Sequence, residues 1–137
     1  MSKYLYRIEH EETRIGPYQT CCDSDYGVGK LVFELVRSKT NENICTRDDT
    51  PVPRSDGLGD HIRLGGGGNG RFGFKSIKRL KSWFTHNPEV YKVFDKCDMV
   101  LARYKVLERF DSKFQSVAYI KEMSERVVLP YSKLNLK

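Results

Sequence analysis

The sequence lacks the cysteine and histidine spacings that bind zinc. Cys21 and Cys22 are adjacent, Cys45 and Cys97 stand alone, and no C-x-x-C pair occurs. The three histidines, at positions 10, 61 and 86, are not spaced with these cysteines as the ligands of one zinc ion would be. We therefore expect reduced thiols and no bound metal.

The sequence also lacks a long hydrophobic run and a catalytic signature. No apolar stretch approaches the roughly 20 residues that a membrane-spanning helix needs, and the first residues form no signal-peptide core. No serine lies in a G-x-S-x-G elbow, and the histidines stand in charged or loop-like contexts. These absences indicate a cytoplasmic protein, in the host cytoplasm if a phage encodes it, with no membrane partner.

The chain does have enough apolar residues for one core, together with an excess of positive charge. Its 137 residues are 39% hydrophobic and 12% aromatic, which suits a single domain over residues 1–137. The formal net charge is +6 and the pI is near 9.2. This charge favours an anionic partner, although a basic surface without a function is an equal alternative.

Hydrophobic periodicity predicts an α+β fold with a mixed, mainly antiparallel sheet and two or three helices. Residues 3–9 alternate as a strand does, and residues 30–37 fit a helix better than a strand. Ser76 is a good N-cap for a helix over residues 76–84. We expect a further helix at residues 89–96 and strands at 72–74, 99–107, 114–120 and 127–129, the last at a sheet edge. Residues 108–113 would join two strands as an antiparallel hairpin or a short excursion.

Residues 38–70 form the least regular part of the sequence. They hold few large apolar side chains, two prolines and a run of four glycines, Gly65 to Gly68. A loop this long within one domain is uncommon unless it is functional or mobile, so we interpret it as a lid or insertion. The alternative for its charged residues is an ordinary solvated loop.

The end of this loop is the predicted working site. Gly68, Gly70 and Gly73 match the letters of the dinucleotide fingerprint, but a strand does not precede the first glycine directly. Phe74 also interrupts what would be a P-loop. We still expect the main-chain amides of residues 68–73, with Arg71 among them, to contact an anionic ligand.

The helix after this loop offers a second, non-enzymatic interpretation. Lys75, Lys78, Arg79 and Lys81 would lie opposite its apolar face. With Phe72 and Phe74 available for stacking, this basic helix could bind nucleic acid or an acidic protein surface.

One pattern resembles the small ADP-ribosyltransferase-like fold. The first strand carries Arg7, and a later strand ends in Ser76 and leads directly into a helix. In that family an arginine on the first strand and a serine at the end of a middle strand bind NAD, and a late-strand glutamate contacts the nicotinamide ribose. The resemblance implies that Arg7 and Ser76 bind NAD or another nucleotide. Gln115 stands where the glutamate would be, which implies binding without transferase activity.

The residues alone leave other roles open for this pair. An arginine within an apolar strand needs an anion or a carboxylate if it is buried, but Arg7 could equally face the surface. Ser76 could act only as a helix cap. The small size, basic charge and large polar loop are also similar to those of bacteriophage accessory proteins, many of which bind and inhibit a host or defence protein.

Overall fold

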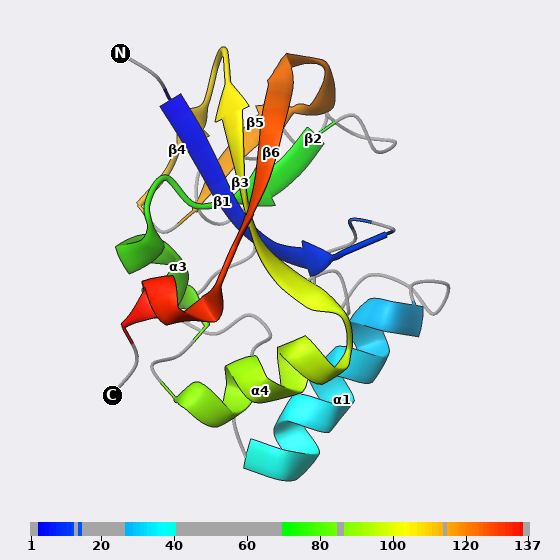
Figure 1. Ribbon diagram of the computed structural model, residues 1–137. Coiled ribbons are helices and arrows are strands. Elements are labelled where there is room, and N and C mark those ends of the chain that lie inside the picture. The colour runs from blue at the N-terminus through cyan, green and yellow to red at the C-terminus, as the bar shows by residue number, and fades with distance from the viewer. Residues whose placement is uncertain are drawn as a thin grey trace.

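The computed structural model describes residues 3–12, 14, 27–40, 70–84, 87–113 and 115–135. These residues form three α-helices and two three-stranded antiparallel sheets (Figure 1). The elements, in chain order, are β1 (Lys3–His10), α1 (Gly27–Thr40), β2 (Gly70–Gly73), α3 (Ile77–Trp83), α4 (Pro88–Lys96), β3 (Met99–Val106), β4 (Phe110–Asp111), β5 (Ser116–Tyr119), the 3-10 turn η3 (Ile120–Glu122), β6 (Met123–Leu129) and the 3-10 turn η4 (Tyr131–Leu134). None of the described helices is long and apolar enough to cross a membrane.

The first sheet has the strand order β1-β3-β6. β1 pairs with β3 along its whole length, from Lys3 opposite Val106 to His10 opposite Met99. Because side chains alternate along a strand, the even-numbered residues of β1 face the opposite side of the sheet from Leu5, Arg7 and Glu9. The sheet therefore has two buried faces with different neighbours.

The second sheet has the strand order β2-β5-β4 and is joined to the first at Phe74. The backbone groups of Tyr6 and Phe74 exchange two hydrogen bonds, each 2.8 Å long. Gly73 permits this close approach, because a Cβ there would lie 2.6 Å from the Tyr6 carbonyl oxygen and 2.9 Å from Leu5 Cγ. Gly73 is therefore needed for the close contact between β2 and β1.

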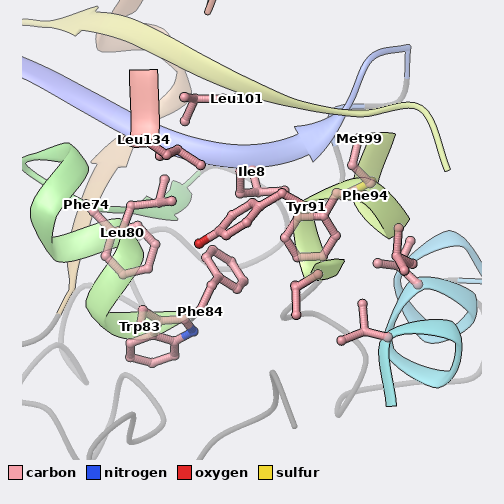
Figure 2. Packing of buried hydrophobic residues seen from close by; sticks show 14 residues of the cluster. Ile8, Phe74, Leu80, Trp83, Phe84, Tyr91, Phe94, Met99, Leu101 and Leu134 are labelled. Atoms are coloured by element: carbon pink, nitrogen blue, oxygen red, sulfur yellow. The ribbon is translucent and has the colours of Figure 1, made fainter. Parts of the chain in front are cut away.

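The larger core lies between the first sheet and the helices. Figure 2 shows Phe74, Trp83 and Phe84 close together beneath β1, with Tyr91 and Phe94 further along the same core. The Phe84 and Phe94 rings meet edge to face, with centroids 5.6 Å apart. This packing explains the apolar spacing of α3 and α4, since each helix buries one stripe against the sheet.

A smaller core joins the two sheets. Its buried members are Leu5 from β1, Ala102, Tyr104 and Val106 from β3, and Ala118 from β5, and Met123 at the start of β6 packs against it. This face of β1 also carries Arg7, so a charged side chain lies beside the smaller core.

Most of the predicted elements are confirmed. The fold is α+β with antiparallel strand pairing, although the strands form two sheets instead of one. The helix predicted at residues 76–84 is α3 with its two caps, Ser76 and Phe84. β6 is an edge strand as expected, but it begins at Met123.

The structure decides between the two alternatives for residues 108–113, and it corrects the bounds of the predicted loop. β3 and β5 do not form a hairpin, because β3 pairs with β1 and β6 while β5 pairs with β2 and β4. β3 contributes to both cores, so it takes the centre of the first sheet, and residues 108–113 are the short excursion that contains β4. The loop predicted for residues 38–70 also begins too early, since Ser38 lies within α1, where Val32 and Val36 are fully buried. Gly70 begins β2, and residues 41–69 lie outside the described residues.

Candidate functional site

Arg7 is buried within the fold and paired with a carboxylate. Both Arg7 and Glu9 are 1% exposed, and Arg7 Nε lies 2.8 Å from Glu9 Oε1. The two residues are two positions apart in β1, which places both side chains on the same face of the strand. Glu9 therefore supplies the anion that a buried arginine requires. The alternative that Arg7 faces the surface is wrong.

The other nitrogens of Arg7 bind two backbone carbonyls from different parts of the chain. Arg7 Nη1 donates to the carbonyl of Phe72 in β2, and Nη2 donates to the carbonyl of Arg14 at 3.2 Å. One planar guanidinium thus joins β1, β2 and the segment after β1.

Glu9 accepts hydrogen bonds on its second oxygen as well. Glu9 Oε2 lies 2.6 Å from the Tyr104 hydroxyl, which donates to it, and 2.8 Å from Arg126 Nε. Burial and the hydrogen bond to Glu9 raise the pKa of Tyr104 to about 12, so its hydroxyl stays protonated at neutral pH. Burial alone would lower the pKa of Arg126, but the hydrogen bond and charge of Glu9 raise it.

A surface cavity of about 160 Å³ lies next to this network. It is lined by Arg14, Arg71, Tyr104, Ile120 and Met123, and we call it the arginine cavity. Two of these five residues are bound by the buried pair, because Arg7 donates to the carbonyl of Arg14 and Glu9 accepts from the Tyr104 hydroxyl. Arg7 also donates to the carbonyl of Phe72, the residue that follows Arg71.

Arg14 has an unusual backbone conformation at the edge of the cavity. Its φ is 63°, a region that costs a residue with a side chain about 1–2 kcal/mol. Its amide donates to the His10 carbonyl at 2.9 Å, and its own carbonyl accepts from Arg7. Hydrogen bonds at both backbone groups therefore hold Arg14 in a conformation that brings it to the cavity.

Positive charge is concentrated around the cavity. Arg7, Arg14, Arg71 and Arg126 contribute four guanidinium groups, and Glu9 is the carboxylate that binds two of them directly. Glu11 and Glu12 also lie in the turn before Arg14, where both are exposed to solvent. An arginine pair beside an apolar wall of Ile120 and Met123 can bind phosphate or carboxylate oxygens.

Several predicted contact residues have structural roles in the described part of the chain. The Ser76 hydroxyl accepts from the Arg79 amide at 3.2 Å and caps α3. Gly73 is buried against β1, and Phe74 is 2% exposed within the larger core, so its ring is not available for stacking. Gly70 begins β2, whereas Gly68 lies outside the described residues. Whether any of them binds a nucleotide stays a prediction.

The four basic residues around α3 divide into two groups. Lys75 and Lys78 are exposed, whereas Arg79 and Lys81 are half-buried. Lys81 Nζ donates to the Leu134 carbonyl at 2.6 Å, so this lysine ties α3 to η4. Phe72, the other predicted stacking residue, is half-buried in β2.

A larger surface cavity, about 260 Å³, lies between α1 and α4, but its charges are mixed. Its lining holds three lysines and two carboxylates together with Thr40 and Val93. Lys92 and Glu89 already form an ion pair there, with Nζ and Oε1 2.8 Å apart. Within the described ranges, no three His, Cys, Asp or Glu side chains are grouped as metal ligands.

Sequence reasoning found two residues of this region and missed the others. Arg71 was predicted to contact a ligand and lines the cavity, and Arg7 lies behind it. Glu9 could have been found, because it follows Arg7 by two positions in a strand. Arg14, Tyr104 and Arg126 gave no local signal, since tertiary pairing alone brings them to Arg7 and Glu9.

Comparison with known proteins gives a family and no established activity. No curated protein and no solved structure matches the chain. Nothing in these comparisons supports the resemblance to ADP-ribosyltransferases. The model of the family described as bacteriophage T4 Y00F protein matches residues 1–129, so the chain belongs to this bacteriophage protein family.

Proposed function

We propose that this phage protein works by binding an anionic group, a phosphate or a carboxylate, in the arginine cavity. The observation that carries the proposal is that Arg7 binds the backbone on both sides of the cavity, through the carbonyl of Arg14 and the carbonyl of Phe72, the residue that follows Arg71. A site whose backbone is already positioned loses less conformational freedom on binding than a site on mobile segments.

The cost of burying the Arg7–Glu9 pair supports the same proposal. Taking two charges out of water costs several kcal/mol per ion, and their mutual attraction often only balances this cost. An apolar pair could fill the same space between the sheets. It could not bind the carbonyls of Phe72 and Arg14 or the Tyr104 hydroxyl. We infer that the pair is retained because it positions the cavity.

The size of the cavity favours one anionic group over a whole dinucleotide. Pockets that enclose a drug-sized ligand usually measure about 300–1,000 Å³, compared with about 160 Å³ here. Arg7 is buried and engaged by protein groups, and the Ser76 hydroxyl caps α3. NAD would therefore bind through one of its phosphates or not at all.

Isothermal titration calorimetry with adenosine 5′-monophosphate, NAD and glutarate tests the proposal. We expect at least one of these anions to bind, and Arg71→Gln to weaken that binding roughly tenfold or more, because a charge-assisted hydrogen bond is worth about 1.5–3 kcal/mol. Lys78→Gln is the matched control, since Lys78 is exposed on α3 and does not line the cavity. Binding of none of these anions, or equal losses in Arg71→Gln and Lys78→Gln, would refute the proposal.

A second candidate function is a binding module for nucleic acid or an acidic host or defence protein. It is favoured by the exposure of Lys75 and Lys78 beside α3, a helix without an acidic residue in its sequence. If α3 binds a polyanion, affinity will fall steeply as salt rises, and charge reversal at Lys78 and Arg79 will abolish it. Unchanged binding in the double variant would eliminate α3 as the interface.

A further inference from the structure

The balance of charge around the arginine cavity suits a ligand with two negative charges. Two guanidinium groups line the cavity, and two more lie behind it on the single carboxylate of Glu9. Arginines therefore outnumber the carboxylate that binds two of them. A phosphate monoester carries about −1.5 to −2 at neutral pH, whereas a phosphate diester or a single carboxylate carries −1.

The shape of the cavity points in the same direction. A monoester phosphate has three unesterified oxygens and one attachment, so it can enter a small hollow with its substituent outside. A diester has a second substituent in place of one of these oxygens, so only two free oxygens remain to accept hydrogen bonds from Arg14 and Arg71. The planar forks of Arg14 and Arg71 match the free oxygens of a terminal phosphate.

We infer that the arginine cavity binds the terminal phosphate of a phosphomonoester and discriminates against phosphodiesters and carboxylates. This inference rests on the proposed function and names the ligand class of the same site. The phosphomonoester could be a mononucleotide or the phosphorylated end of a nucleic acid strand, because both present the same group.

Matched ligands separate the contribution of the terminal phosphate from that of the rest of the molecule. Adenosine 5′-monophosphate and adenosine 3′,5′-cyclic monophosphate share the base and sugar but present a monoester and a diester. Methyl phosphate and dimethyl phosphate repeat the comparison without a nucleoside. A short oligonucleotide with a 5′-phosphate, compared with the same strand ending in a 5′-hydroxyl, tests the nucleic acid source.

We expect each monoester to bind at least tenfold more tightly than its diester and than acetate, which carries a single carboxylate. Amide shifts in nuclear magnetic resonance spectra should change at Arg71 and Ile120. Arg71→Gln should remove this preference, and Arg14→Gln provides a second test at a solvent-exposed side chain if the first variant is poorly folded. Lys133→Gln, at an exposed lysine of η4 that does not line the cavity, should leave the preference unchanged.

The possible failures are distinguishable. If acetate or the cyclic nucleotide binds as tightly as the monoester and loses affinity in Arg71→Gln, the anion site stands and the inference about phosphomonoesters is wrong. If no anion binds, both the inference and the proposed function are wrong. If mononucleotides bind but a phosphorylated strand end does not, the inference holds and the source is a small molecule.

Discussion

Arg7 and Glu9 form an ion pair in which both side chains are 1% exposed and Arg7 Nε lies 2.8 Å from Glu9 Oε1. The pair lies at the junction of four strands and the arginine cavity, because its remaining polar atoms bind Phe72, Arg14, Tyr104 and Arg126. Disruption of the Arg7–Glu9 pair should therefore affect both stability and ligand binding. Different variants can separate these two effects.

Glu9→Gln should destabilise the protein strongly. The substitution keeps the size of the side chain but leaves the Arg7 guanidinium buried without a counter-ion, a change that typically costs about 3–5 kcal/mol. Urea unfolding followed by tryptophan fluorescence measures the loss. Glu89→Gln is the control, because Glu89 forms an exposed ion pair with Lys92 that should be worth less than about 1 kcal/mol. Equal effects of the two variants would contradict the structural role of Glu9.

Arg7→Lys should weaken anion binding although Arg7 does not line the cavity. Lysine keeps the positive charge near Glu9, but a single ammonium group lacks the planar fork that reaches the carbonyls of Phe72 and Arg14. We expect roughly a tenfold loss of affinity for adenosine 5′-monophosphate, with changed amide shifts at Arg14 and Arg71.

Arg103→Lys is the control for this prediction. Arg103 is half-buried in β3, where its guanidinium lies 4.7 Å from the centre of the Tyr4 ring, away from the lining of the cavity. The Arg103→Lys variant should lose some stability and keep its affinity for adenosine 5′-monophosphate. Unchanged affinity in Arg7→Lys, at normal stability, would show that Arg7 does not position the site.

Tyr104 should make the protein less stable at high pH. Its pKa is raised to about 12 in the folded protein, above the value of about 10 for a tyrosine in an unfolded chain. Between these two pH values the folded state keeps the Tyr104 proton and the unfolded state has lost it. Stability therefore falls as pH rises through this range. The free energy of unfolding, measured as a function of pH, should fall less steeply at alkaline pH in Tyr104→Phe than in the unsubstituted protein. An identical decline in both would contradict the raised pKa.

Ser76→Ala separates a helix cap from a ligand contact. Loss of the hydrogen bond to the Arg79 amide should cost about 1 kcal/mol of stability. If the cap is the whole role of Ser76, the affinity for adenosine 5′-monophosphate and for NAD stays unchanged in calorimetry. A loss of affinity without a loss of stability would favour the resemblance that assigns Ser76 to a nucleotide.

The hydrophobic pattern predicted the elements well because it is a local property. Tyr4, Tyr6 and Ile8 alternate as a strand requires, and the spacing of Leu80, Trp83 and Phe84 fixes the buried side of α3. The same pattern could not predict that β3 is a central strand, because pairing partners are chosen by burial on both of its faces.

The sequence by itself determined that β1 is a strand with Arg7 and Glu9 on one face, that Ser76 begins a helix, and that the chain carries an excess of positive charge. Only the tertiary structure decided that Arg7 points inward and that Arg14, Arg71 and Tyr104 meet at one cavity. The physical reason is that alternation and capping depend on neighbours along the chain. The cavity instead depends on β2 pairing next to β1 and on buried hydrogen bonds between residues up to 117 positions apart.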